Sequence, residues 1–290
     1  MSDPRAEAGG LILLDKPAGI TSHTAVERAR HLLGIRRIGH AGTLDPFATG
    51  LLILLVGRAT RLLPFLDAEP KVYRATIRFG VRTTTDDPEG TVIAESAVPE
   101  QEIVERAIPT LTGHLLQRPP AFSAKRVAGV RAYAAARRGE IIALEPVAVT
   151  VHKWTVLARS GADLEVEVWC SAGTYVRALA RDLGEACGSV AHLAALRRTG
   201  SGRFSVDDAQ SLEQLEHGDF RVLSAGAAVE HLPVLELDDL DARRITHGQT
   251  VTAGLETRGD VVALRHGEEL LAVAMRDGAS WRPRVVMRDA

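Results

Sequence analysis

Asp45 is the residue of this chain that is best placed to do chemistry. It lies in a loop rich in Gly, Thr and Pro, Gly39–Gly50, and an entirely apolar run follows at 51–56. Loop acids normally face water, but rigid backbone beside this one and an apolar wall behind it would shift its pKa. A turn aspartate that caps the apolar run is the commoner role of an Asp-Pro pair. The Gly-rich surroundings, with His40 five residues upstream, favour a reactive carboxylate.

Arg177 is the predicted partner of that carboxylate. A lone buried acid needs a cation nearby, because burial by itself raises the pKa and neutralises it. Arg177 lies where a predicted strand at 164–170 passes into a predicted helix, and such strand ends point side chains toward clefts. A surface pair with Arg181, four residues on, would bring two like charges together and is a poor alternative. We therefore expect Arg177 to keep Asp45 ionised.

Tyr73 and Arg58 are further candidates for contact with a nucleotide. Tyr73 begins the apolar face of an alternating strand at 72–79, where core filling is the commoner role, but a ring in a cleft would stack on a base. Arg58 belongs to Gly57–Arg61, which is either a phosphate contact or a solvated turn. The sequence contains no Gly-rich nucleotide-binding loop and no His/Cys cluster with metal-ligand spacing.

Short strands and helices alternate around these residues. Apolar periodicity predicts strands at 11–14, 72–79, 164–170, 261–265, 270–275 and 284–287. It predicts helices from a cap at Ser22 or Thr24 to Gly34, at 103–111 with a kink at Pro109, at 176–183 and at about 189–197. Because the last strands are separated by short turns, the chain is expected to end in a small all-β module that begins near residue 230.

The charge of the chain is unevenly distributed, which favours a polyanionic partner despite a net charge of −2. Residues 16–82 hold 11 basic and 4 acidic side chains, and residues 118–138 hold 6 basic and none acidic. Residues 204–241 are acidic, with 1 basic side chain against 10 acidic ones. With a third block at 171–203, which holds 5 basic and 2 acidic side chains, these basic blocks could fold into one basic face; the alternative is an ordinary solvated surface. Only two cysteines, no apolar stretch of membrane-spanning length and a polar N-terminus predict a cytoplasmic location.

Three separated motifs and a fourth, weaker one carry a family resemblance. They are Leu13–Ser22, Gly39–Gly50 with Gly57–Arg61 after it, Gly173–Arg177 running through to Arg198, and Pro120–Lys125 with Tyr133 after it. In this order the chain resembles the TruB family, the bacterial tRNA pseudouridine-55 synthases. The match spans about residues 11–203, which makes coincidence of all four motifs a poor explanation.

This resemblance implies a fold and a division of the chain. The expected fold is α/β, of the α+β type, with a mixed sheet flanked by helices and a small C-terminal β module that resembles a PUA domain. A disordered tail at 1–10 would precede a catalytic domain at 11–229, which carries a mobile basic arm at 117–140. Residues 230–290 would form the PUA-like RNA-binding domain.

The resemblance also implies roles for individual residues. Asp45 falls on the catalytic aspartate, Tyr73 on the tyrosine that stacks on the target uracil, and Arg177 on the arginine that pairs with the aspartate. The residues expected to bind the substrate or to support its site are His40, Tyr175, Leu196, Lys16, Pro17, Arg58, Lys125 and Arg126. Many relatives have a lysine where Arg126 stands, so the roles of Lys125 and Arg126 stay open.

The implied reaction is isomerisation of a uridine in the tRNA T-loop, at position 55, to pseudouridine. The base must leave the stack to be reached. Asp45 could act as a nucleophile or as the base that removes a sugar proton, and the sequence leaves both open. We expect no cofactor, no metal, no membrane and no required protein partner, with a monomer that binds the tRNA T-arm stem-loop. The alternatives are a synthase for another RNA site and a non-catalytic RNA-binding protein or tRNA-folding chaperone.

Overall fold

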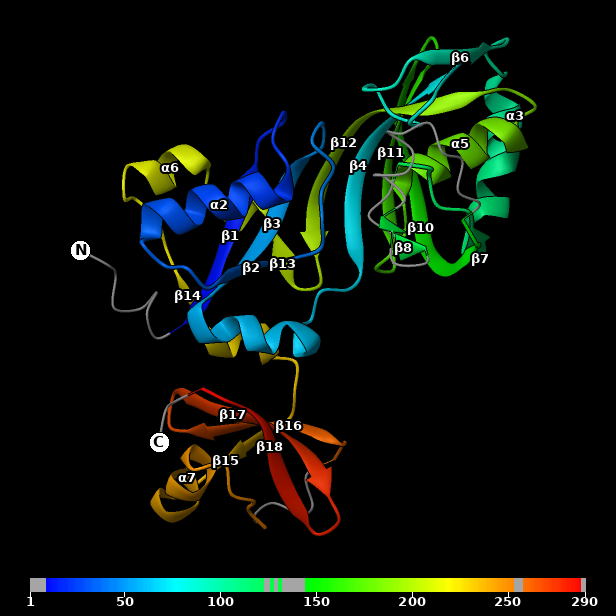
Figure 1. Cartoon of the computed structure of the whole chain (residues 1–290). Helices are drawn as coiled ribbons and strands as arrows, with labels where there is room; N and C mark the ends of the chain where they lie inside the picture. Colours follow the sequence, from blue (N-terminus) through cyan, green and yellow to red (C-terminus); the bar gives the residue numbers. More distant parts are fainter. Residues whose placement is uncertain (1–8, 123–125, 128–129, 132–143, 253–257, 288–290) are drawn as a thin grey trace.

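A long mixed sheet runs through most of the computed structural model, which describes residues 9–122, 126–127, 130–131, 144–252 and 258–287 (Figure 1). Its strands follow one another in the order β14 (Leu223–Ser224), β1 (Gly10–Lys16), β3 (Thr49–Val56), β12 (Ala191–Ser201), β4 (Lys71–Phe79), β11 (Asp163–Cys170), β10 (Val147–Ser160) and β7 (Gly113–Gln117). Two further strands join it, β2 (Ile38–Ala41) on β3 and β13 (Phe204–Ser205) on β12. The mixed α/β fold predicted from the sequence is confirmed.

The two halves of this sheet meet where β3 runs parallel to β12. The pairing is short, with Arg197 opposite Thr49 and Arg198 opposite Gly50, while the other strand pairs of the sheet are antiparallel. Gly50 has a φ of +99°, and a Cβ there would lie only 2.2 Å from the Arg198 carbonyl oxygen. Only glycine allows this approach, so it fixes the loop that carries Asp45 against the centre of the sheet.

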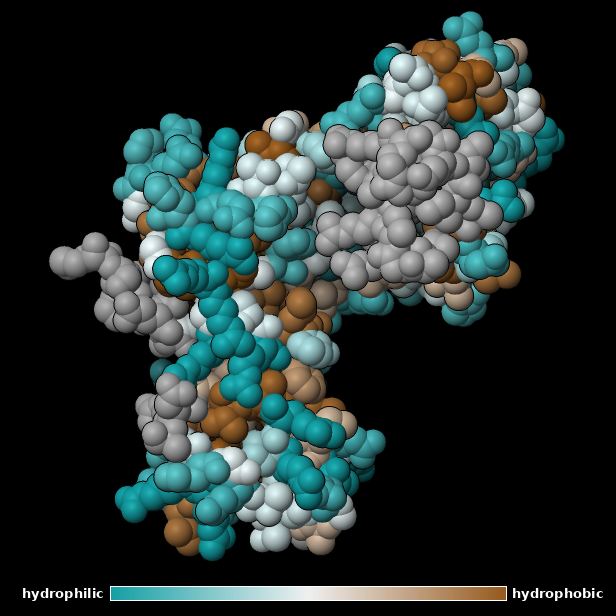
Figure 2. Space-filling view, in the orientation of Figure 1, coloured by the Kyte–Doolittle hydropathy of each residue, from teal (hydrophilic) through white to brown (hydrophobic). Residues whose placement is uncertain are grey.

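The helix α2 (Ser22–Leu33) covers one face of the first half. Its Ala25, Val26 and Ala29 are buried against β1 and β3, and Figure 2 shows hydrophilic side chains over its outer face. The side chain of Thr21 caps the helix by accepting the Thr24 N–H at 2.9 Å, so the predicted cap at Ser22 or Thr24 is wrong by one residue or more. The helix ends at Gly34, in the left-handed conformation, as predicted.

The helices α5 (Val176–Ala186) and α3 (Gln101–Ala107) cover one face of the second half. The predicted alternation of β4 is confirmed, because Ile77 and Phe79 are buried there while Arg74 and Arg78 are exposed. A 3-10 turn, η2 (Ile108–Leu111), continues α3 and contains Pro109, where the sequence predicts a kink.

The helix predicted at about 189–197 is wrong, because residues 191–197 belong to β12. The segment is rich in Ala and Leu, which favour helices, but β12 pairs with β4 over most of its length. Two register shifts in this pairing, between Leu193 and Ala195 and between Arg198 and Gly200, interrupt the two-residue alternation that marks an ordinary half-buried strand. Long-range pairing therefore outweighs local propensity here.

A second sheet forms from the C-terminal part of the chain, with β15 (Val234–Glu236), β16 (Val261–His266), β17 (Glu269–Asp277) and β18 (Ser280–Val286) in that order. The three last strands are those predicted from the sequence. The module is not all-β, because α7 (Asp239–Thr246) packs on it after an Asp238 cap. Ala263, Leu270 and Val273 share one apolar core with β1 and β3, so the two sheets are packed together.

Short elements complete the described structure. They are η1 (Gly57–Phe65), β5 (Val81–Thr83), β6 (Val92–Glu95), β8 (Arg126–Val127), β9 (Val130–Arg131), η3 (Val206–Asp208), α6 (Leu212–Glu216) and η4 (Ala225–Val229). The expected tail and arm overlap regular structure at their edges, since Gly10 belongs to β1 and Gln117 to β7. Residues 123–125, 128–129 and 132–140 of the predicted basic arm lie outside the described residues. Among the described helices, none is both long and apolar enough to cross a membrane.

Candidate active site

The structure brings Asp45 and Arg177 together across 132 residues of sequence. Arg177 Nη2 donates to Asp45 Oδ1 at 3.1 Å, and Arg177 Nε lies 2.9 Å from Asp45 Oδ2. The arginine side chain is 5% exposed and that of the aspartate 31%. The second position of α5 thus presents a buried guanidinium to one side of a carboxylate whose other side stays open. Such a pair orients the acid while leaving it accessible to a substrate.

Burial raises the pKa of Asp45, and the Arg177 guanidinium only partly opposes that rise. As expected from the sequence, Arg177 acts to lower this pKa and so favours the ionised carboxylate, but burial has the larger effect. The charge of Asp87 also acts to raise the pKa. A carboxylate with a raised pKa is a stronger base than an ordinary aspartate, which suits proton transfer or attack near neutral pH.

Asp87 is a second, buried carboxylate on the far side of the same guanidinium. Arg177 Nη1 donates to Asp87 Oδ2 and to the Thr85 carbonyl oxygen, both at 3.1 Å. Arg177 Nη2 also donates to the Phe122 carbonyl oxygen at 2.9 Å. These bonds fix the plane of the guanidinium, and with it the orientation of Asp45. The sequence analysis missed Asp87, although its Thr-Thr-Thr-Asp-Asp-Pro surroundings are typical of a hydrogen-bonded turn.

A cavity of about 240 Å³ opens beside this carboxylate. Of the residues predicted from the sequence it is lined by Asp45, Tyr73, Arg177, Tyr175 and Leu196. Burial raises the pKa of Tyr73, so its hydroxyl stays protonated at neutral pH. The cavity therefore combines one acid with a flat aromatic wall and an aliphatic wall, which suits a planar heterocycle.

Comparison with known proteins identifies the family of this arrangement. Residues 30–176 match the family model for TruB family pseudouridylate synthase (N terminal domain), and residues 177–233 match that for the tRNA pseudouridylate synthase B C-terminal domain. The chain belongs to the TruB family. The resemblance found in its sequence is thereby confirmed, and the chain is an enzyme of the pseudouridine synthase class.

Relatives and solved structures agree with this membership over nearly the whole chain. The chain is 44% identical to tRNA pseudouridine synthase B of Thermobifida fusca, covering 96% of this chain and 98% of that one. It is 47% identical to that of an Arthrobacter species, with 84% and 83% covered. A solved Cbf5-Nop10-Gar1 complex matches with a TM-score of 0.73 at 26% identity, with 100% and 92% covered. An H/ACA RNP bound to a substrate RNA matches with a TM-score of 0.74 at 25% identity, with 98% and 86% covered.

Lys16 holds the loop that carries Asp45 in this TruB-family chain. It is buried, and its Nζ donates to the carbonyl oxygens of Pro17 and Ile20 at 2.8 Å and of Pro46 at 3.4 Å. Burial lowers the pKa of Lys16 to about 8. The lysine ties the exposed turn that contains Pro17 to the residue after Asp45, so it shapes the loop and does not line the cavity around Asp45.

His40 and Arg58 lie outside the residues that line this cavity. His40 is on β2, and its buried Nδ1 has no hydrogen-bond partner. Burial lowers the pKa of His40, which keeps the ring neutral. Arg58 Nη1 donates to the Met287 carbonyl oxygen at 2.9 Å, so this side chain reaches the C-terminal sheet. Lys125 lies outside the described residues, and of Arg126 only the backbone, in β8, is described.

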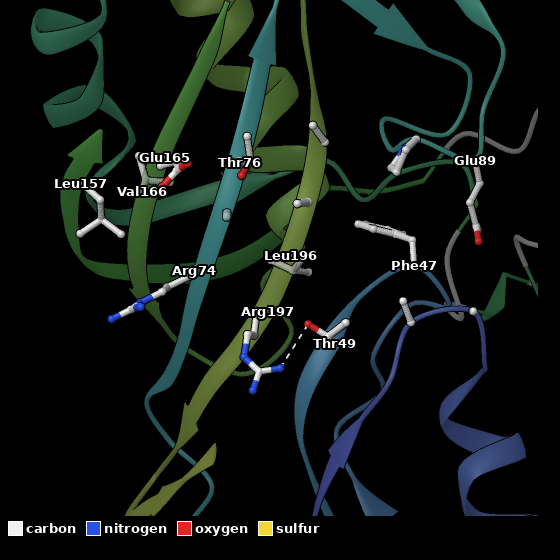
Figure 3. A pocket seen from close by; sticks show the side chains of 16 residues that line it. Phe47, Thr49, Arg74, Thr76, Glu89, Leu157, Glu165, Val166, Leu196 and Arg197 are labelled. Carbon is white, nitrogen blue, oxygen red and sulfur yellow. Dashed lines mark hydrogen bonds between the residues drawn. The ribbon is translucent and has the colours of Figure 1, made fainter. Parts of the chain in front are cut away.

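A larger hollow of about 610 Å³ shares Leu196 with the first cavity (Figure 3). Figure 3 shows Phe47 and Glu89 on one side of β12, and Arg74 on the other. Arg197 also lines it and forms an ion pair with Asp15 at 2.7 Å. The TruB-family site thus has polar and cationic side chains beside the cavity as well as inside it.

Proposed function

We propose that this protein isomerises a uridine in the T-loop of tRNA, at position 55, to pseudouridine, with Asp45 as the catalytic carboxylate. The observation that carries the proposal is a single accessible carboxylate, held by the buried Arg177, beside a cavity walled by Tyr73 and Leu196. The relatives that match almost the whole chain are named tRNA pseudouridine synthase B, which supports tRNA as the substrate. The reaction rearranges bonds within one nucleotide, so it requires no cofactor.

The cavity is suited to a base that has left the helical stack. Flipping a loop nucleotide costs less than opening a duplex, because fewer stacking and pairing contacts are lost. Tyr73 would stack on the uracil from one side and Leu196 would contact it from the other. A closed cavity also keeps the detached uracil beside the sugar until it rejoins through its C5 atom. His40, on the strand that leads into the loop, would support the loop while the base is out.

Asp45 has two chemically sound roles in this reaction. It can attack C1′ of the ribose as the N1–C1′ bond breaks, or it can remove the proton from C2′. Both roles require the ionised carboxylate and a fixed orientation, which the ion pair with Arg177 supplies. Both also benefit from a pKa that is higher than that of an ordinary aspartate.

The remainder of the chain would hold the RNA. Arg74 and Arg197 lie in the larger hollow next to the cavity, where they could contact phosphates. We assign residues 11–229 to the catalytic domain, with the basic arm at 117–140, and residues 230–290 to a PUA-like RNA-binding domain. The protein would act as a monomer on the T-arm in the cytoplasm, without a protein partner.

Mapping of pseudouridine tests this function directly. Unmodified tRNA is incubated with the protein, and pseudouridines are located by carbodiimide adducts and primer extension. We expect one new stop in the T-loop, at position 55. A stop at another site would show that the enzyme modifies a different uridine from the one proposed. No stop at all, with tight tRNA binding, would favour an RNA-binding protein or folding chaperone.

The Asp45→Asn variant tests the catalytic carboxylate. The amide keeps the size and one oxygen of the side chain, but it can neither attack C1′ nor accept a proton. We expect single-turnover rates to fall by at least about 10⁴-fold while the Kd for tRNA stays within about twofold. Filter binding and the rate of pseudouridine formation give the two quantities. Residual activity near the wild-type rate would remove Asp45 from the chemistry.

A further inference from the structure

Two buried cations, Lys71 and Arg198, lie side by side at the active-site cavity, and the chemistry described above uses neither. They are 5% and 1% exposed, and both line the cavity. A Cβ added at Gly42 would lie 3.2 Å from Arg198 Nη1 and 3.5 Å from Lys71 Nζ. The two groups therefore reach the same point beneath the loop that carries Asp45.

The partners of these cations are neutral. Lys71 Nζ donates to Ser201 Oγ at 2.7 Å, and Arg198 donates to the carbonyl oxygens of Leu51 at 2.7 Å and Gly42 at 3.1 Å. Among the described residues, neither cation has a carboxylate within ion-pair distance. Two buried like charges without an anion are costly, so a fold that keeps them beside its reactive acid indicates that a negative charge arrives there.

The surroundings of Lys71 show the same imbalance of charge. Burial and the charge of Arg198, on β12, lower the pKa of Lys71 to about 8. The groups that oppose this are Glu69, on the preceding segment, and Cys170, on β11. Glu69 is engaged elsewhere, since its carboxylate accepts the Ala172 N–H at 3.0 Å. At neutral pH the cavity therefore holds two positive charges that form no ion pair with a carboxylate of the described residues.

The arrangement of β4 and β12 relates these cations to the stacking surface. Lys71 precedes Tyr73 by two residues on β4, and Arg198 follows Leu196 by two residues on β12. Residues two apart on a strand face the same side, and Arg198 pairs with Tyr73 across the two strands, so both cations lie on the same face of the sheet as the slot lined by the tyrosine and the leucine. A base held in that slot, with its sugar toward Asp45, would turn a polar edge toward the cations.

Resting on the proposed function, we propose that Lys71 and Arg198 form an electrostatic cradle for the uracil carbonyl oxygens, which stabilises the uracil anion released when the N1–C1′ bond breaks. The electron pair of that bond leaves with N1 and is spread over the two carbonyl oxygens. Asp45 loses its negative charge in the same step, by bonding to C1′ or by taking the C2′ proton. Charge thus moves from a carboxylate paired with Arg177 to a ring paired with Lys71 and Arg198.

The second half of the reaction reverses this transfer. C5 of the uracil bonds to C1′, while Asp45 departs as a carboxylate or returns its proton to C2′. The proton on C5 is then lost and N1 gains one, so that the product is an isomer of the substrate. Preorganised cations at a site of developing charge need no reorganisation, and one such donor is typically worth about 10²–10³-fold in rate.

Substitution of Lys71 tests the cradle, because Arg198 also holds two backbone carbonyls and its loss would disturb the fold. Lys71→Met removes the charge and keeps the buried stem. We expect the single-turnover rate at pH 7 to fall by about 100-fold, the Kd for tRNA to stay within about twofold, and Lys71→Arg to recover most of the rate. Lys153→Met, at an exposed lysine of β10, is the matched control and should behave as wild type.

A leaving-group experiment separates this role from a purely structural one. Fluorine at C5 withdraws electrons and stabilises the uracil anion by itself, so 5-fluorouridine depends less on the cradle. With tRNA that contains 5-fluorouridine, the loss caused by Lys71→Met should shrink by about tenfold or more. The rate is measured as the loss of 5-fluorouridine from nuclease digests of the tRNA over time. Equal losses with uridine and 5-fluorouridine would overturn the cradle.

The remaining outcomes are also distinct. If Lys71→Met lowers tRNA affinity as much as it lowers the rate, Lys71 binds a backbone phosphate and the cradle is wrong. If wild type forms pseudouridine and Lys71→Met matches its rate, the cradle fails while the proposed function stands. If wild type forms no pseudouridine, the proposed function itself fails.

Discussion

At the scale of residues, the geometry of the site depends on a buried arginine that pairs with two carboxylates. Arg177 lies between Asp45 and Asp87, so one cation serves an accessible acid and a buried one. Asp87 is buried behind the Arg177 guanidinium and so cannot contact a substrate in the cavity. Its effect on the reaction would be to fix Arg177, and through it the carboxylate that reacts.

The Asp87→Asn variant tests this positioning role. The amide can still accept from Arg177, but the loss of charge weakens the bond that sets the guanidinium plane. We expect the single-turnover rate to fall by about 10–100-fold with unchanged tRNA affinity. Asp163→Asn is the matched control, since Asp163 pairs with Arg78 on the exposed part of β4 at 2.6 Å. A rate equal to wild type in Asp87→Asn would show that Asp45 orients Arg177 without help.

The folded protein should gain stability from Lys71 as the pH rises above neutrality. Lys71 has a pKa of about 8 in the folded chain and 10.5 as an ordinary lysine. The unfolded chain therefore binds more protons above pH 8, and stability rises with pH in that window. Between pH 7 and 9, the free energy of unfolding of wild type should rise by about 1 kcal/mol relative to Lys71→Met. Urea denaturation at each pH measures it, and parallel curves would contradict the lowered pKa.

At the scale of elements, α5 is held at its start by the end of β7. No side chain caps this helix, but the side-chain amide of Gln117 forms hydrogen bonds with both the N–H and the carbonyl group of Tyr175, the residue before the helix. The Tyr175 N–H donates to Gln117 Oε1 at 2.8 Å, and Gln117 Nε2 donates to the Tyr175 carbonyl oxygen at 3.1 Å. The turn before Arg177 is thereby tied to the second half of the sheet.

Loss of this amide should be costly because the Gln117 side chain is buried and its two hydrogen bonds to Tyr175 are partly shielded from water. In Gln117→Ala the Tyr175 N–H loses its acceptor, and we expect the free energy of unfolding to fall by about 1–3 kcal/mol. Gln117→Glu keeps the acceptor for the Tyr175 N–H but loses the donor to the Tyr175 carbonyl oxygen. It should therefore lower the free energy of unfolding by less than Gln117→Ala does. Urea denaturation compares the variants. A cost below about 0.5 kcal/mol for Gln117→Ala would mean that water replaces the amide.

At the scale of the whole molecule, the two sheets share one apolar core. Leu270 and Val273 of β17 are buried in the same cluster as Leu11 and Leu55 of the long sheet. Arg58 and Arg61 add hydrogen bonds to the carbonyl oxygens of Met287 and Val286. A shared core couples the unfolding of its parts, so the C-terminal sheet is not expected to melt separately.

Calorimetry of a core variant tests this coupling. Leu270→Ala should lower the free energy of unfolding by about 2–4 kcal/mol and move one single transition to lower temperature. Leu240→Ala, at an exposed leucine of α7, is the control and should change it by less than about 0.5 kcal/mol. A second transition that alone responds to Leu270→Ala would show that the sheets unfold independently.

The sequence by itself determined the features that depend on neighbouring residues. The alternation of β4 and β11, the periodicity of α2 and α5, and the three last strands follow from local patterns that the structure confirms. The motifs around Asp45 and Arg177 also identified the family, because they are short and contiguous in the chain.

Tertiary structure alone decided what depends on residues distant in the chain. The segment Ala191–Ser201 became a strand because β4 pairs with it, against its local preference. Asp87 and Lys71 joined the site because folding brings them to Arg177 and Arg198, 90 or more residues away. Even the direction of the pKa shift of Asp45 was settled there, since burial is a property of the packed molecule and no pattern of neighbouring residues encodes how much water it leaves.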